Sequence, residues 1–208
     1  MSDLRTVLKG HRIIPVVTLA DVALALPLAE ALLEGGIGIV EITLRSEAGL
    51  AVIEMLREEL PEMKVGAGTV LTPLLLQRAH SAGAQFFVSP GLSTEMREGG
   101  RGLAFLPGVA TASEVMEALA GDYTHLKFFP AESAGGIAAL KQLGSVFPTV
   151  SFCPTGGVDE ENMADYLALK NVFAVGGSWL APADALAARD WKRIRDIARR
   201  SVDSIASS

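Results

Sequence analysis

Short apolar runs alternate with helical patterns along the whole chain, and this alternation constrains the fold more than any other feature. Eight runs with β-strand character are each followed by a segment with helical periodicity, at roughly 26 residues per unit. Alternating β and α elements indicate parallel strands joined by right-handed crossovers. We therefore predict an α/β fold, a single-domain (β/α)8 TIM barrel over residues 1–208 with a short N-terminal helix.

The predicted elements follow one another without a linker, a low-complexity tract or a break in composition. The expected strands span 13–19, 37–44, 64–68, 85–89, 104–107, 125–130, 150–154 and 172–175. The expected helices span 2–10, 21–34, 47–60, 72–82, 94–98, 111–120, 135–143, 159–169 and 182–200, the last as one or two helices. Ser2 is the expected cap of the first helix, and Pro27 is expected to kink or split the second.

An open doubly wound sheet is the alternative arrangement of such units. It predicts a glycine fingerprint directly after the first strand, and residues 17–21 contain no glycine. The barrel is therefore favoured.

The charge balance argues against a nucleic-acid surface. The formal net charge is -6 and the isoelectric point is about 5.1, so no basic stripe is available to neutralise phosphates. Arginines do cluster over 189–200, but their helical spacing among acidic residues indicates a solvated face. A mean hydropathy of +0.35 is typical of strands covered on both faces, or of an oligomer.

Three absences favour a cytoplasmic location. Cys153 is the single cysteine and cannot form an internal disulfide. The N-terminal residues 1–5 lack an apolar signal region, and the chain has no run of about 18 apolar residues. We therefore expect neither export nor membrane insertion.

Lys127 lies in the middle of the apolar stretch 125–130. Lysine is rarely buried, because its charged form is costly to remove from water. Either Lys127 lies near the strand end and reaches solvent through its aliphatic stem, or burial favours the neutral amine, which can attack a carbonyl carbon.

Glu41 is a second charged residue inside a predicted strand. Side chains alternate between the faces of a strand, so Glu41 shares a face with Thr43 and Arg45, and the apolar residues between them pack against helices. Glu41 and Lys127 can therefore project into one cavity near the mouth of the barrel. A buried ion pair kept for structure is the alternative, but such pairs are often no better than apolar replacements.

Glycine-rich turns follow the seventh and eighth strands, at Thr155-Gly156-Gly157 and at Gly176-Gly177-Ser178. Glycine there leaves backbone N–H groups open to an anion, and many barrels bind phosphate in these two loops. A tight turn also favours glycine, but the two turns together favour a phosphate site.

Other candidate groups form no recognisable site. His11, His80 and His125 lack metal-ligand spacing, and Cys153 is an expected core residue. No Ser-His-Asp order stands out, and Trp179 and Trp191 are expected to pack.

Six segments resemble the family of 2-keto-3-deoxy-6-phosphogluconate (KDPG) aldolases, which often also cleave 4-hydroxy-2-oxoglutarate (KHG). They occur in family order and span nearly the whole chain. The segments are Val40–Arg45, Val65–Leu71, Phe87–Gly91, Leu126–Glu132, Phe152–Gly157 and Gly176–Leu180. Residues 98–102 depart from the pattern, being shorter and richer in glycine, and put only the local helix in doubt.

The resemblance implies a class I, metal-independent aldehyde-lyase that needs no cofactor, forms a cytoplasmic homotrimer, and cleaves KDPG to pyruvate and glyceraldehyde 3-phosphate and KHG to pyruvate and glyoxylate. It implies Lys127 as the Schiff-base lysine and Glu41 as the acid/base. Arg45 and Thr69 would bind the carboxylate of the pyruvyl group, with Pro90 and Phe129 lining its pocket. Around the phosphate or distal end of the substrate it implies Thr155, Gly156, Gly157, Gly177 and Ser178.

Three alternatives stay open from the sequence. The preferred substrate could be the 6-phosphogalactonate isomer. The chain could be a phosphosugar isomerase or epimerase with Glu41 as base and Lys127 as an electrostatic partner, or a barrel that binds sugar phosphate without turnover. The two enzyme classes differ in imine formation, which the isomerase does not need.

Overall fold

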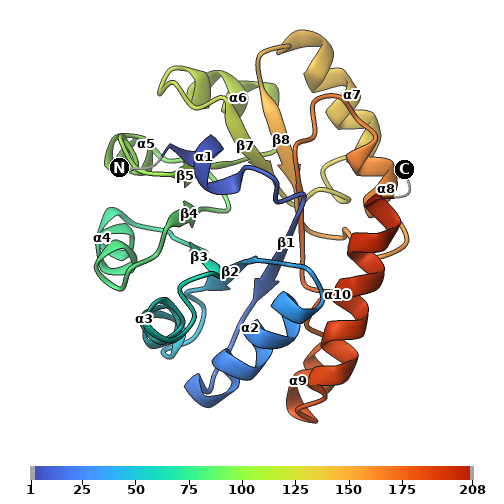
Figure 1. Cartoon of the computed structure of the whole chain (residues 1–208). Helices are drawn as coiled ribbons and strands as arrows, with labels where there is room; N and C mark the ends of the chain where they lie inside the picture. Colours follow the sequence, from blue (N-terminus) through green and yellow to red (C-terminus); the bar gives the residue numbers. More distant parts are fainter. Residues whose placement is uncertain (1–2, 207–208) are drawn as a thin grey trace.

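The architecture is known from a computed structural model, which describes residues 3–206. Strands lie around the centre of the molecule and helices lie outside them (Figure 1). This is the arrangement that alternating β and α segments predict, because each crossover helix covers the outer face of the sheet.

All of the paired strands run parallel, as predicted. The strands are β1 (Ile13–Val17), β2 (Ile39–Thr43), β3 (Lys64–Gly68), β4 (Phe86–Val88), β5 (Phe105–Leu106), β6 (Gly108–Val109), β7 (His125–Phe128), β8 (Ser151–Pro154) and β9 (Val175–Gly177). Six of them form one sheet in the order β5-β4-β3-β2-β1-β9, and β6-β7-β8 form a second. The fold is therefore α/β with a curled parallel sheet that forms a half-barrel.

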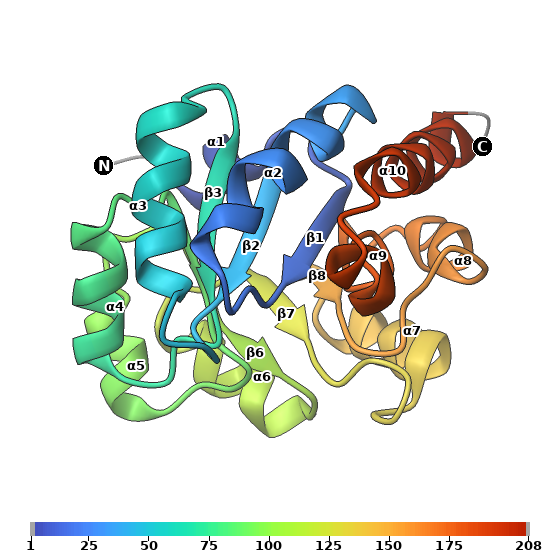
Figure 2. The same ribbon diagram turned by 90° about the horizontal axis from the view of Figure 1, so that it is seen from below.

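The helices connect successive strands. They are α1 (Leu4–Leu8), α2 (Ala25–Glu34), α3 (Gly49–Glu59), α4 (Pro73–Ser81), α5 (Thr94–Gly99), α6 (Ala112–Leu119), α7 (Gly136–Val146), α8 (Met163–Leu167), α9 (Ala183–Ala187) and α10 (Trp191–Ala206), with a 3-10 turn at Val22–Leu24. The C-terminal α10 packs against α2 (Figure 2), so the end of the chain covers its beginning.

Side chains at the helix starts explain several boundaries. Thr72 accepts a hydrogen bond from the backbone N–H of Leu75, and Pro73 occupies the first helical position, where its missing N–H is not needed. Thr111 and Glu114 form a reciprocal capping box at the start of α6. Both helices begin within a residue of the predicted positions.

Pro27 does not kink a helix, although the second helical segment is split as predicted. It lies in the first turn of α2, where backbone N–H groups have no partner within the helix. The preceding residues form the 3-10 turn Val22–Leu24, which Asp21 caps through the N–H of Ala23. The predicted cap Ser2 lies outside the described residues.

Several predicted boundaries are wrong, among them the end of the last helix, which runs to Ala206 and not to 200. The last strand is Val175–Gly177 and not 172–175, because its pairing with β1 begins at Ile13↔Val175 and leaves the preceding residues without a partner there. Pro107 separates the predicted strand 104–107 into β5 and β6. The helix predicted from residue 159 begins at Met163, because the Asp159 side chain instead closes a turn over Asn162.

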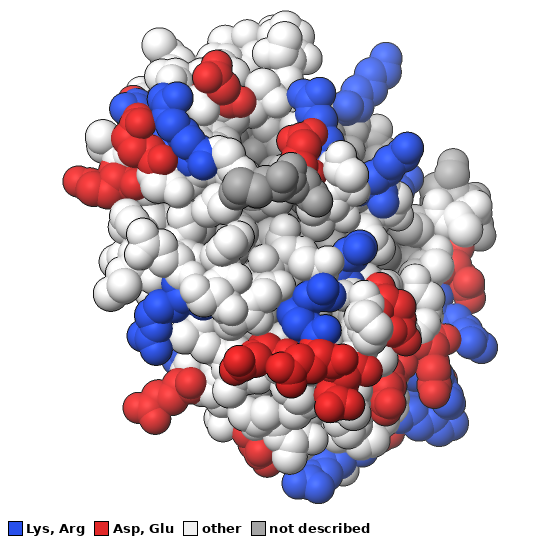
Figure 3. Space-filling view, turned by 60° about the vertical axis from the view of Figure 1, so that its left-hand side comes forward, with Lys and Arg blue, Asp and Glu red and all other residues white. Residues whose placement is uncertain are grey.

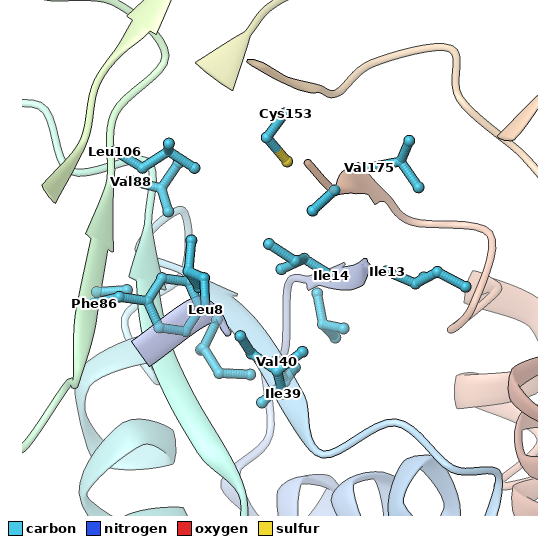
Figure 4. Packing of buried hydrophobic residues seen from close by; sticks show 14 of the residues in the cluster. Leu8, Ile13, Ile14, Ile39, Val40, Phe86, Val88, Leu106, Cys153 and Val175 are labelled. Atoms are coloured by element: carbon cyan, nitrogen blue, oxygen red, sulfur yellow. The ribbon is translucent and has the colours of Figure 1, made fainter. Parts of the chain in front are cut away.

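The interior between the two sheets, whose strands are together called the strand ring below, is mainly apolar. Figure 4 shows side chains from several strands converging there, with Leu8 of α1 contributing from the end at which the strands begin. Ile14, Ile39 and Phe86 line this interior and are each at most 2 % exposed, so they help to fix the positions of their strands. The inward-facing polar residues are therefore held on rigid supports.

Apart from the buried Glu41 and Lys127, the charged side chains of residues 3–206 lie at least partly on the outside. On the face drawn in Figure 3, acidic and basic groups are interspersed and several acidic side chains form a row, so this face carries no continuous basic stripe. Among residues 3–206, no helix has both the length and the apolar character that crossing a bilayer requires.

Candidate active site

Lys127 and Glu41 meet inside the strand ring, as predicted. Lys127 lies on β7 and is 5 % exposed, and Glu41 lies on β2 and is 3 % exposed. The Lys127 Nζ is 3.5 Å from Glu41 Oε1, and it also lies 5.1 Å from the centroid of the Phe129 ring. The amine therefore has a carboxylate and an aromatic face as its neighbours and almost no contact with solvent.

Gly68 on β3 provides the space that Glu41 occupies. A Cβ atom at residue 68 would overlap the carboxylate of Glu41, so the side chain could not lie where it does next to any other residue. β2 and β3 pair in register from Ile39↔Lys64 to Thr43↔Gly68. The glycine in Gly66-Ala67-Gly68 therefore has a steric role in placing the acid.

Arg45 and Thr69 are brought together at the ends of β2 and β3. The Arg45 Nε donates a hydrogen bond of 3.0 Å to Thr69 Oγ1. Thr69 has a φ of 56°, in the left-handed region that β-branched residues rarely adopt. The strained backbone holds the hydroxyl against the guanidinium, whose remaining N–H groups can bind a carboxylate.

A cavity of about 570 Å³ opens at the carboxyl ends of β1, β8 and β9. Its lining contains seven of the predicted substrate-binding residues: Arg45, Phe129, Thr155, Gly156, Gly157, Gly177 and Ser178. This volume suits a small organic ligand. The two glycine turns, separate in the sequence, therefore border one space, as predicted.

The loop after β7 is tied to the loop after β8. The N–H groups of Ala131 and Glu132 donate to the carbonyl oxygens of Thr155 and Gly156 at 2.8 and 3.1 Å. Gly156 has a φ of 93°, a conformation that glycine adopts without strain. These bonds hold the Phe129 ring between Lys127 and the glycine turn.

Pro90 lies next to the Lys127 strand, outside the cavity lining just described. Gly108 pairs with Lys127, and a Cβ at Gly108 would overlap the carbonyl group of Pro90. Pro90 therefore lies beside the strand that pairs with the Lys127 strand, and its place in a pyruvyl pocket stays a prediction.

Cys153 on β8 lies opposite Lys127 on β7 in the sheet, but its thiol is unreactive. The thiol is buried among apolar side chains (Figure 4), and burial raises its pKa to about 12. It stays protonated at neutral pH and is a core residue, as predicted. Among residues 3–206, no three His, Cys, Asp or Glu side chains gather in a way that could hold a metal ion.

Two polar contacts at the site were not singled out from the sequence. Thr18 Oγ1 and Thr43 Oγ1 are 2.7 Å apart, and Thr18 lines the cavity. Glu132 accepts a hydrogen bond from the buried Tyr166 hydroxyl. Burial raises the pKa of Tyr166, and the bond to Glu132 raises it further, so the hydroxyl stays protonated and donates. The position of Thr18 at a strand end was a visible signal, whereas that of Tyr166 on α8 gave none.

This arrangement suits carbonyl chemistry on an anionic ligand. A buried amine can add to a ketone, and a carboxylate beside it can exchange protons with the adduct. Arg45 and the glycine turns line the same open space, so together they can hold the anionic groups of one molecule.

Comparison with known families assigns the same chemistry. Residues 4–197 match the family model described as "Aldolase: KDPG and KHG aldolase". The match covers all nine strands of the fold and the residues predicted from the sequence.

Individual relatives match over nearly their full lengths. The chain is 46 % identical over 196 residues to the 2-dehydro-3-deoxy-phosphogluconate aldolase of Pseudoalteromonas atlantica, covering 93 % of this chain and 91 % of that protein. It is 43 % identical to the KHG/KDPG aldolase of Escherichia coli (strain K12), covering 97 % and 96 %. A crystal structure of KDPG aldolase from Legionella pneumophila, with pyruvate captured as a covalent carbinolamine intermediate, superposes with a TM-score of 0.93 at 42 % identity, covering 95 % and 97 %.

Proposed function

Because the chain belongs to the KDPG and KHG aldolase family, we propose that it is a class I aldolase that cleaves KDPG to pyruvate and glyceraldehyde 3-phosphate. It also cleaves KHG to pyruvate and glyoxylate, an activity in the name of the Escherichia coli relative. The substrate is a small keto acid, phosphorylated in the case of KDPG. The single observation that carries the residue assignment is the buried contact of 3.5 Å between Lys127 and Glu41.

Lys127 is the proposed nucleophile. Its neutral amine adds to the C2 ketone of the substrate to form a carbinolamine, and loss of water gives a protonated imine. Glu41 donates the proton that the leaving hydroxyl needs. The contact of 3.5 Å lets Glu41 accept a proton from the Lys127 amine before the amine attacks.

Cleavage then uses the imine as an electron sink. Glu41, as carboxylate, removes the proton of the C4 hydroxyl, the C3–C4 bond breaks, and its electrons move into the iminium to leave an enamine. The aldehyde departs from C4. Protonation of the enamine at C3 and hydrolysis of the imine release pyruvate and return the free amine.

The remaining predicted residues position the two ends of the substrate. Arg45, supported by Thr69, binds the carboxylate next to C2, and Pro90 and Phe129 line the pyruvyl pocket. Thr155, Gly156, Gly157, Gly177 and Ser178 bind the phosphate or the distal end, mostly through backbone N–H groups. No cation lies in either glycine turn, so turn geometry is central to this binding.

We also propose that the two sheets form one closed (β/α)8 barrel and one domain. Isolated bridges at Phe152↔Val172 and Thr155↔Gly176 support closure between β8 and β9, and a single residue separates β5 from β6. The proposed assembly is a cytoplasmic homotrimer. The exposed apolar side chains Leu71, Leu74 and Met116 supply surface for such contacts. Light scattering on the purified protein tests the trimer, and a monomeric mass would contradict it.

Substrate preference tests the proposed activity. Cleavage rates are compared for KDPG, its 6-phosphogalactonate isomer and KHG, with pyruvate release followed by coupled reduction. The proposal expects the highest kcat/KM for KDPG, because the backbone N–H groups of the glycine turns bind its phosphate. Isomerisation of phosphosugars without pyruvate release would contradict it and favour the epimerase alternative.

A further inference from the structure

A second cavity lies at the opposite end of the strand ring from Lys127. It measures about 460 Å³ and is bounded by α1 and by residues at or just before the starts of β1, β7, β8 and β9. Its lining is Arg5, Leu8, Lys9, Gly10, His11, Arg12, His125, Ser151 and Phe173. None of these residues belongs to the proposed active site.

The charge of this lining is entirely positive. Arg5, Lys9 and Arg12 supply three cations, and the lining contains no aspartate or glutamate. Within residues 3–206, none of the three makes an ion pair with a carboxylate. Three like charges around one concave space repel one another, and a bound anion relieves that repulsion. The concentration stands out in a chain whose net charge is -6.

Hydrogen bonds fix two of the cations in place. Arg5 Nη2 donates to Thr124 Oγ1 at 3.0 Å, and Arg12 Nη2 donates to the carbonyl oxygen of Leu167 at 2.9 Å. Each guanidinium has five N–H donors, so most remain available to a ligand. An anchored guanidinium loses less side-chain entropy on binding than a free one.

Two histidines add donors that respond to charge. His125 packs against the Phe173 ring with centroids 5.1 Å apart. Burial, and then the charge of Lys64, lower the pKa of His11. Burial, and then the charge of Arg5, lower the pKa of His125, while Asp3 acts in the opposite direction. Both are therefore mainly neutral at pH 7 and each offers one N–H.

We propose that this cavity binds a phosphate-bearing small molecule, with Arg5, Lys9 and Arg12 holding the phosphate and His11 and His125 completing its donors. Arginine pairs with phosphate through two parallel hydrogen bonds, which accounts for the use of two anchored guanidinium groups. The volume exceeds that of a phosphate ion and accommodates an organic part beside the Phe173 ring.

A neighbouring cavity provides a comparison. It shares Arg5 and His125 and is similar in volume, at about 470 Å³, but Asp3 and Asp122 also line it. Its mixed charge disfavours an anion, so the ligand belongs on the side of Lys9 and Arg12. The acidic chain also disfavours a nucleic acid, which needs a long basic surface.

The three histidines provide the readout for a test on the intact protein. The pKa of each is measured by NMR with and without inorganic phosphate, and in a second arm with adenosine monophosphate. The proposal expects phosphate to raise the pKa of His11 and of His125 by about 0.5 and to leave His80, outside the cavity, unchanged. If phosphate and the nucleotide bind with equal affinity, the site takes the free ion. If the nucleotide binds more tightly, the site takes an organic phosphate. Both results support the proposal.

Variants locate the binding. Lys9→Glu should weaken phosphate binding about tenfold, because it changes the charge beside the ligand by two. Lys141→Glu makes the same change on the exposed face of α7 and should leave the affinity unaltered. Equal affinity in the two variants, or equal shifts of all three histidines, would overturn the proposal. Because the readout is binding near His11 and His125, the outcome does not depend on aldolase activity.

Discussion

Cationic side chains lie at both ends of the strand ring, but their surroundings differ. At the carboxyl end, Lys127 is buried, and one carboxylate lies 3.5 Å from its nitrogen. At the amino end, Arg5, Lys9 and Arg12 are exposed and have no carboxylate partner among the described residues. Strand β7 joins both environments, since it begins at His125 and carries Lys127 two residues later.

The difference teaches that residue type alone does not decide what a cation does. A buried amine beside an acid can lose its proton and form a covalent bond, whereas an exposed guanidinium stays charged and can only attract an anion. Changes at the carboxyl end should therefore alter the rate of the reaction, and changes at the amino end should not.

Removing the acid should give the largest effect. Glu41→Gln keeps the size of the side chain but cannot take up the C4 hydroxyl proton, so kcat on KDPG should fall roughly 10²–10⁴-fold. Steady-state cleavage measures this. Turnover near the wild-type rate would remove Glu41 from the mechanism and leave the buried pair with a structural role.

Filling the space beside the acid should have the next largest effect. In Gly68→Ala the new methyl group overlaps the Glu41 carboxylate and forces it to move. A displacement of this kind should lower kcat about 10²-fold and reduce the free energy of unfolding by about 1–3 kcal/mol. Gly10→Ala is the matched control at the amino end. There a methyl group has no neighbour within 4 Å, although the φ of 84° adds strain, so stability should fall and kcat should hold.

Loss of one donor at the distal end should affect binding more than rate. Ser178→Ala should raise KM for KDPG about tenfold, the cost of a hydrogen bond to a charged group, and should affect KHG little because KHG has no phosphate. Kinetics on both substrates separate the two effects. An equal rise in KM for both would place Ser178 away from the phosphate.

The smallest effect should come from the amino end. Arg5→Ala removes an exposed side chain with one hydrogen bond, to Thr124, so it should change the free energy of unfolding by less than about 1 kcal/mol and leave kcat/KM on KDPG unaltered. Thermal unfolding and steady-state kinetics measure both. A marked loss of turnover would show that the two ends are coupled and would break the comparison.

The contact between Lys127 and Glu41 was predictable because both residues interrupt apolar strands and alternation along β2 directs Glu41 inward. The glycine turns were predictable because the residues that favour turns are recognised from the local sequence alone. The start of β9 was misplaced because it depends on pairing with β1, a contact between residues far apart in the chain. The Tyr166 contact with Glu132 and the gathering of cations beside His125 likewise depend on packing, which no local pattern carries.

The account depends most on a covalent bond to one amine. Incubation with pyruvate and borohydride, followed by peptide mass spectrometry, shows which of the six lysines carries a reduced pyruvyl adduct: Lys9, Lys64, Lys127, Lys141, Lys170 or Lys192. The account predicts an adduct on Lys127 together with loss of aldolase activity. An adduct confined to another lysine, or full activity without any adduct, would contradict it.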